Sequence, residues 1–382
     1  MGRSRTAGLF LRGGVWHVDK RVRGFGRLCE STGASDPGEA ERYLARRLEE
    51  IRQATVYGVR PTRLFRQAAT KYLEDELLAG TKRSLSRDAQ ALKAVDSYIG
   101  DLALRQVHMG TLQSFIQARR KAGRQPATIR RDLATVRRIL NLAARLWRDE
   151  NGMTWLETPP LIQMPKGPAR QPYPLSWEEQ RHLFDQLPAH LQAMALFKVN
   201  TGCREQEICR LRWDWEVQVP ELATSVFIIP GHQVKNGEER LVVLNRIAAS
   251  VIEAQRGKHP EAVFTYRGQP VTKMYNSAWK RARREAAKAY AKESGRPAPA
   301  GFAAIRVHDL KHTFGRRLRA AGVSFEDRQD LLGHRSGRIT THYSAAELGN
   351  LIAAATTVCG DNSRKTPALV VLRGGAAVGR AA

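Results

Sequence analysis

The sequence predicts a mainly α-helical chain with small β-sheets, an α+β fold. Apolar and polar residues alternate over residues 9–33, with glycine turns between the alternating runs, and this is the period of β-strands. Apolar residues then recur at helical spacing through most of the chain. A second alternating pair, SVFIIPG and RLVVLN, flanks a turn at Lys235 and predicts a hairpin in the second half.

Residues 1–58 are expected to form a three-stranded antiparallel sheet followed by a helix. Asp36 is a suitable helix N-cap, and Pro37 fits the first helical turn. The first 27 residues are rich in arginine and lysine and contain one acid, Asp19. Such a basic ribbon can enter a groove of DNA. A solvated sheet face would give the same pattern, so both interpretations stay open here.

Residues 62–150 are expected to be wholly helical, in segments separated by turns at Gly80, Gly100 and Gly123. In the last segment an apolar stripe is surrounded by guanidinium groups, and a row of that kind can follow DNA phosphates. A plain solvated helix face would look similar. The candidate phosphate contacts are Arg130, Arg131, Arg137 and Arg138.

The rest of the chain divides by composition. Residues 151–171 are rich in proline and glycine, which predicts a linker. Residues 172–350 are expected to form a further domain, which contains the hairpin and several helices. Residues 351–382 are expected to be a largely disordered C-terminal tail.

The composition points to a polyanionic partner. A formal net charge of +26 suits nucleic acid first and an anionic membrane surface second. The cysteines show no CxxC or CxxH spacing, so we expect reduced thiols and no structural zinc. No apolar run is long enough for a membrane span, and no signal peptide is visible. The expectation is a cytoplasmic protein, nucleoid-associated when bound to DNA.

The motif HDLKHTF concentrates chemistry at the start of a predicted helix. A buried stripe through Leu310 and Phe314 would turn His308, Lys311 and His312 to the opposite side. Such a face near a helix N-terminus can hold a phosphate. A histidine at a helix start is also often a simple cap.

Two further motifs accompany it. TGCREQE puts Arg204 at a helix start with Glu207 three residues on, and either a phosphate or Glu207 is the expected partner of this arginine. LLGHRSGRITTHYS places His334 after a helix that ends at Gly333, with Tyr343 nine residues beyond that histidine.

These motifs together resemble the catalytic domain of the tyrosine recombinases, the phage integrase family. The order TGCREQE, a lysine in a hairpin turn, HDLKHTF, LGHRS and HYS matches the family over roughly residues 172–350. Residues 62–150 are similar to its core-binding domain, and residues 1–58 resemble its arm-binding domain. The resemblance implies an N-terminal sheet, a helical unit and a mixed α/β catalytic domain.

The resemblance also implies site residues. Arg204 and Lys235 would act on the phosphate and the leaving group, His308 and His334 would flank the scissile phosphate, and Tyr343 would be the nucleophile. Glu207 would support Arg204. Lys311 departs from the pattern, because the family usually has a second arginine at this position.

The chemistry of the residues agrees with these roles. Cationic donors can stabilise the non-bridging oxygens, and Tyr343 can conserve the bond energy in a covalent link, so that religation needs no ATP. Lys235 on a mobile turn can protonate the departing 5′ oxygen. These motifs contain no carboxylate cluster suited to Mg²⁺, so we expect neither a metal nor a cofactor.

The sequence therefore predicts a site-specific recombinase, an integrase of a prophage or other mobile element, working through a 3′-phosphotyrosine intermediate. The expected partners are double-stranded attachment-site DNA, three further copies in a homotetramer, and accessory DNA-bending proteins. Two alternatives stay open. One is a DNA-binding protein of the same fold with impaired cleavage, which Lys311 favours. The other is a relaxing enzyme like the type IB topoisomerases, which share the tyrosine chemistry.

Overall fold

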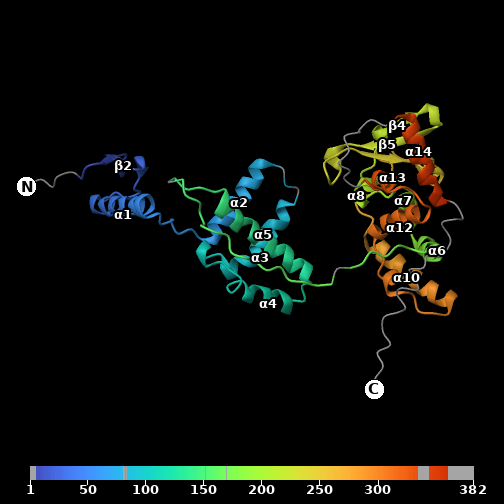
Figure 1. The fold of residues 1–382 in the computed structure, drawn as a ribbon, viewed down its shortest axis with the longest axis horizontal. Helices are drawn as coiled ribbons and strands as arrows, with labels where there is room; N and C mark the ends of the chain where they lie inside the picture. Colours follow the sequence, from blue (N-terminus) through green and yellow to red (C-terminus); the bar gives the residue numbers. More distant parts are fainter. Residues whose placement is uncertain are drawn as a thin grey trace, which may run out of the picture. The chain divides into compact units, whose positions relative to one another are not determined.

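The computed structural model describes residues 6–80, 82, 84–150, 152–168, 170–333 and 344–359. The chain separates into two compact units, Met1–Ala169 and Arg170–Ala382 (Figure 1). Among the described helices, none combines the length and apolar character that a membrane span requires.

The N-terminal sheet and helix have the predicted form. Strands β1 (Leu9–Arg12), β2 (Val15–Val22) and β3 (Gly26–Ser31) pair antiparallel in that order, and α1 (Pro37–Tyr57) follows. Asp36 caps the helix, because its Oδ2 accepts from the Glu39 amide at 2.9 Å. Val18 and Leu28 of the sheet are buried against Leu44 and Ile51 of α1, which gives this part its own small core.

The helical part of the first unit consists of α2 (Phe65–Ala79), α3 (Leu85–Ile99), η1 (Leu104–Gln106), α4 (Gln113–Lys121) and α5 (Pro126–Arg145). The apolar stripe of α5 is buried in the shared core, and the four candidate arginines of this helix are exposed. The turns at Gly80, Gly100 and Gly123 separate the helices as expected.

Residues 152–168 contain no helix and no strand, yet they are not a free linker. Leu156 and Ile162 are buried in the core of the helices, and the Trp155 ring lies 4.1 Å from the Arg63 guanidinium carbon. The proline and glycine content correctly predicted an irregular backbone. It could not predict this packing, because single apolar residues between prolines show neither helical nor strand periodicity.

The second unit contains a three-stranded sheet, a two-stranded sheet and helices. Its elements are α6 (Trp177–Gln186), α7 (Ala189–Thr201), α8 (Glu205–Cys209), η2 (Trp213–Trp215), β4 (Glu216–Val219), η3 (Pro220–Leu222), β5 (Thr224–Ile229), η4 (Gly231–Gln233), β6 (Arg240–Val243), α9 (Arg246–Glu253), β7 (Thr265–Tyr266), β8 (Gln269–Pro270), α10 (Ser277–Ser294), α11 (Ala300–Ala303), α12 (Val307–Ala320), α13 (Phe325–Leu332), α14 (Ala345–Thr356) and η5 (Thr357–Cys359). The predicted hairpin is β5 and β6, and Lys235 lies in its connection. A third strand, β4, completes the sheet on the other edge of β5.

Helix α12 lies at the centre of this unit. Leu310, Phe314 and Leu318 are fully buried, as the periodicity predicts, and α12 packs against α7 and α13. This packing brings the start of α12 close to the C-terminal ends of the other two helices.

The last described helix extends beyond the expected domain end. The sequence placed the end of the catalytic domain at residue 350, which is wrong, because α14 continues to Thr356 and Leu351 and Ala355 are buried. Asn245 secures it by donating to the Ala355 carbonyl at 3.1 Å. In Figure 1 this helix lies beside the sheet of β4 and β5. Residues 360–382 lie outside the described residues.

Candidate active site

Two helix ends meet near the start of α12. Helix α7 ends at Gly202 (φ 64°) and α13 ends at Gly333 (φ 57°), both in the left-handed conformation that stops a helix. Arg204 follows the first glycine by two residues, and His334 follows the second directly. The carbonyl groups at such ends carry partial negative charge and need donors.

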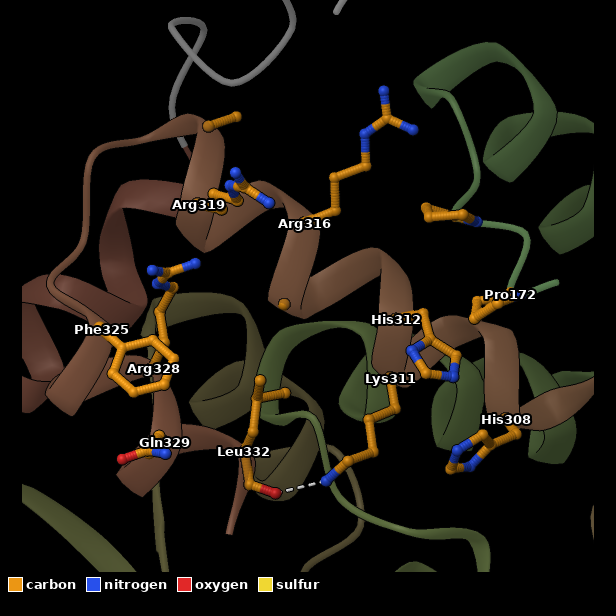
Figure 2. A pocket seen from close by; sticks show the side chains of 13 residues that line it. Pro172, His308, Lys311, His312, Arg316, Arg319, Phe325, Arg328, Gln329 and Leu332 are labelled. Atoms are coloured by element: carbon orange, nitrogen blue, oxygen red, sulfur yellow. Dashed lines mark hydrogen bonds between the residues drawn. The ribbon is translucent and has the colours of Figure 1, made fainter. Parts of the chain in front are cut away.

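Lys311 bridges the two ends. Its Nζ donates to the Gly202 carbonyl at 3.0 Å and also to the Leu332 carbonyl (Figure 2). The side chain is only 4% exposed, although Lys311 lines the same cavity as His308 and His312. Burial first, and then the charges of Arg240 and Arg204, lower its pKa to about 7.

Arg240, at the start of β6, makes a second bridge. Its Nη2 donates to the carbonyls of Thr201, at 3.4 Å, and Leu331, at 3.0 Å. Its Nε lies 3.2 Å from Oε2 of the buried Glu207. Burial alone would raise the pKa of this carboxyl, but Arg240 and Arg204 together lower it below the usual value, so Glu207 is ionised at neutral pH.

Arg204 is held by the same carboxylate. Its backbone N–H donates to Glu207 Oε2 and its Nη1 to Oε1, both at 2.7 Å, and its Nη2 donates to the Gly333 carbonyl at 3.2 Å. The pairing of Arg204 with Glu207 that the i, i+3 spacing predicted is therefore present. The side chain keeps 24% exposure, which leaves it accessible to a ligand.

Lys198 was missed by the sequence analysis. It is fully buried in α7, and its Nζ donates to the Cys203 carbonyl, directly before Arg204. Burial lowers its pKa to about 8. The available signal was a lone lysine inside the apolar run MALFKVN, where a charge has to find a buried partner.

His308 and His312 lie side by side on the first turns of α12. Their ring centroids are 4.8 Å apart at an interplanar angle of 87°. Partial burial, followed by the charges of His312, Lys198 and Lys311, lowers the pKa of His308 to about 4. The pKa of His312 is also lowered, chiefly by burial. The two rings are thus neutral at pH 7 and serve as hydrogen-bonding groups, not as the cations that the motif suggested.

The acid of the HDLKHTF motif offsets only part of this lowering, although its charge raises the pKa of both histidines. Asp309 is buried and accepts hydrogen bonds from both Nη atoms of Arg170, at 2.9 and 2.6 Å. It also accepts hydrogen bonds from the backbone N–H groups of Arg306 and Tyr173. It caps α12 and ties it to the segment before α6.

A cavity of about 830 Å³ opens beside these groups, between residues 172–174, α12 and α13. Figure 2 shows Lys311 and the two histidines on one wall and the arginines farther along α12 and α13. Among the described residues, no acidic side chain lines it. The basic and imidazole groups that do are His308, Lys311, His312, Arg316, Arg319 and Arg328.

The remaining candidates are placed differently. Lys235 lies exposed in the β5–β6 connection and is not among the residues that line the cavity. His334 and Tyr343 lie outside the described residues.

Another group in this unit has the side chains that could ligate a metal. Donor atoms of Glu178, His182 and Glu293, on α6 and α10, lie within 4.8 Å of one another. Arg181 already donates to Glu293 and lies 3.3 Å from His182 Nε2. The Arg181 guanidinium therefore already supplies the positive charge that these donor atoms would attract. We assign no metal ion to this group.

Comparison with known proteins identifies the family. Residues 177–348 match the phage integrase family. These residues form the phage integrase domain of the tyrosine recombinases. It is 24% identical to the integrase of Salmonella phage P22 over 375 residues, which cover 88% of this chain and 90% of the relative. Tyrosine recombinase XerC of Xanthomonas campestris is 25% identical over 295 residues, covering 74% and 84%.

Solved structures show the same fold. A lambda integrase dimer bound to a COC′ core site superposes with a TM-score of 0.53 at 16% identity, covering 96% of this chain and 98% of that one. A lambda integrase tetramer bound to a Holliday junction gives 0.51 at 14% identity, covering 90% and 99%. The predicted fold class and family are confirmed, and with them the activity class, site-specific recombination by DNA cleavage and religation.

Proposed function

We propose that this integrase-family chain inserts or excises a prophage or other mobile element through a 3′-phosphotyrosine intermediate. One observation carries the assignment of the site. Lys198, Arg204, Arg240 and Lys311 surround a single buried carboxylate, Glu207, beside a cavity without acidic groups among its described lining residues. Buried positive charge in excess is costly unless an anion compensates it. A DNA phosphodiester supplies that anion.

The proposed roles of the basic residues follow from their exposure and from their positions at the cavity. Arg204 is partly exposed, and Lys311 lines the cavity, so these two would donate to the non-bridging oxygens and stabilise the transition state. Neutral His308 would add a hydrogen bond at the rim, and His334 is proposed to act on the same phosphate.

The covalent step conserves the phosphodiester energy. The Tyr343 oxygen attacks phosphorus and loses its proton, the bond to the 5′ oxygen breaks, and a 3′-phosphotyrosine forms. Lys235, on its exposed turn, would swing in to protonate the departing 5′ oxygen. Attack by a 5′ hydroxyl of the partner strand reverses the step and rejoins the DNA without ATP.

Covalent capture tests this function. A core site nicked just beyond the cleavage position loses a short 5′-hydroxyl fragment after attack, and the wild-type protein should accumulate as a 3′-linked adduct. A wild type that binds the site and yields no adduct would support the non-cutting alternative. Efficient relaxation of a supercoiled plasmid that lacks the site would support the topoisomerase-like alternative.

We further propose that the exposed arginines of α5 contact DNA phosphates. Replacing Arg130, Arg131, Arg137 or Arg138 singly with alanine should make the negative slope of log affinity against log salt shallower by about one for each phosphate that is no longer neutralised. Arg66→Ala is the matched control, because Arg66 is already paired with Asp96 at 2.9 Å and with Asp101. If the α5 variants show the same salt slopes as Arg66→Ala, these arginines contact solvent and not DNA.

Residues 1–58 are proposed to bind a separate class of DNA site. Deleting them should leave covalent capture on a core site intact, because the proposed catalytic residues all lie after residue 200. Integration should fall, and the salt slope should become shallower, since fewer phosphates are neutralised. The measurement compares full-length and truncated protein in suicide-substrate and integration assays. Unchanged integration would rule out an arm-binding role.

The assembly is proposed to be a homotetramer on two duplexes, with DNA-bending accessory proteins as further partners. The lambda integrase tetramer on a Holliday junction supports this stoichiometry. Sedimentation of this protein with a synthetic four-way junction should give four protomers per junction, and two would contradict it.

A further inference from the structure

We propose that Arg240 is a positioning residue for strand cleavage, which holds the ends of α7 and α13 together and thereby sets the position of Arg204. This inference rests on the proposed function and deepens it. It concerns a residue that lies outside the motifs and does not line the cavity.

The basis is a double row of carbonyl groups, each held by a basic side chain. Residues 201–203 form one row, at the end of α7, and residues 331–333 form the other, at the end of α13. Arg240 joins the first carbonyl of each row, and Lys311 joins the second of each. Lys198 takes the third carbonyl of one row, and Arg204 the third of the other. We call these four side chains and six carbonyls the staple.

The staple opposes a specific repulsion. Two helix C-termini that point into one buried space present like partial charges to each other, and their final carbonyls have no partner within the helix. Cationic donors between the rows satisfy these carbonyls and attract both ends. The spacing of the two chains is therefore fixed by the side chains that bridge them.

Arg240 differs from the other bridging group, Lys311. Its side chain is 2% exposed, and it is not among the residues that line the cavity. Among the described residues, its hydrogen-bond and ion-pair partners are the two carbonyls and Glu207, and we expect it to affect a DNA phosphate through these partners.

Gly333 shows how close the fit is. A β-carbon at this position would lie 1.5 Å from Arg240 Nη1, and the backbone φ of 57° already disfavours other residues. The backbone immediately before His334 therefore rests against the guanidinium. Arg240 consequently defines the place where the chain leaves α13.

The same side chain controls Arg204 electrostatically. Glu207 faces Arg204 at the start of α8, Arg240 on β6, Lys198 on α7 and Lys311 on α12. Without Arg240 the buried carboxyl would keep its burial penalty and lose a main charge partner, so its pKa would rise. A protonated Glu207 would hold Arg204 less firmly.

Arg240→Met in the full-length protein tests the proposal. The single-turnover rate of adduct formation at saturating DNA should fall about 10²-fold, as expected when catalytic groups are displaced by roughly 1 Å. DNA affinity should change by less than about threefold, because affinity comes chiefly from phosphate contacts elsewhere. The acidic limb of the pH–rate profile should move to higher pH, because the active form needs ionised Glu207.

Arg317→Met is the matched control. Arg317 is 6% exposed, lies 3.4 Å above the Trp177 ring and donates to Gln180, away from the staple. Its replacement removes an equally buried guanidinium. The rate per folded molecule and the pH profile should both stay at wild-type values.

Two further variants protect the test against misfolding. Arg240→Lys keeps the charge, but one nitrogen cannot serve Glu207 and both carbonyls, so about a tenfold loss of rate is expected. Gly333→Ala retains Arg240 and forces it aside, and should lower the rate similarly. Wild-type rates in these variants, or an equal loss and pH profile in Arg317→Met, would overturn the positioning role. A wild type that forms no adduct would instead overturn the proposed function, and the two failures are distinguishable.

Discussion

Replacing Tyr343 with phenylalanine should abolish covalent capture of DNA and leave DNA binding within about twofold of wild type. The change removes the phenolic oxygen and keeps the ring, so packing and phosphate contacts persist while the nucleophile is lost. Removing a nucleophile typically lowers the rate by about 10⁴-fold or more. The measurement is adduct formation on the nicked core site, with binding to the same DNA followed in parallel.

Other tyrosines of the same unit provide the controls. Tyr266 stacks on His190 with ring centroids 4.2 Å apart, and the Tyr275 hydroxyl accepts from Arg283 at 3.1 Å. Tyr266→Phe and Tyr275→Phe should form the adduct at wild-type rates. An adduct that persists in Tyr343→Phe would move the nucleophile to another residue, and peptide mapping of the linked DNA would locate it.

The sequence predicted those parts of the site that depend on local spacing. Arg204 and Glu207 are three residues apart at a helix start, so the backbone itself brings them together. The order of the motifs predicted the family, and periodicity predicted the buried side of α12. Each of these inferences needs only a few neighbouring residues.

The staple could not be predicted, because its partners are backbone groups far apart in the chain. Arg240 is the first residue of the strand RLVVLN, and a charged residue at the start of a strand is normally expected to be exposed to solvent. Its burial depends on the ends of α7 and α13 meeting there. The neutral state of His308 likewise depends on burial and on Lys198, neither of which is visible from helical spacing. Packing between distant segments decides these properties.

Lys311→Ala should lower the cleavage rate by about 10²-fold or more, as expected for loss of a strong donor to the transition-state oxygens. The same change also leaves the carbonyls of Gly202 and Leu332 without their buried donor, which adds a structural cost. Single-turnover adduct formation at saturating DNA measures the first effect, and thermal unfolding measures the second. Undiminished cleavage by Lys311→Ala would exclude the phosphate contact.

The position prefers lysine over the usual arginine for a geometric reason. One ammonium can sit between two carbonyls and keep its third proton for a phosphate, whereas a planar guanidinium needs more room in a site where Lys311 is 4% exposed. Lys311→Arg should therefore cleave more slowly than wild type. If lysine were instead a remnant in a protein that does not cut, the wild type would form no adduct and Lys311→Arg would restore one.

The pH dependence separates these cases further. The pKa of Lys311 is lowered to about 7, so in the free protein the ammonium is lost as the pH rises through that value. A bound phosphate favours the charged form and raises the pKa. The second-order rate of capture should thus fall above about pH 7, while the rate at saturating DNA should fall only at higher pH. Lys311→Arg should lack this difference, because a guanidinium stays charged throughout this range. Identical pH profiles for wild type and Lys311→Arg would show that the protonation of Lys311 does not control cleavage.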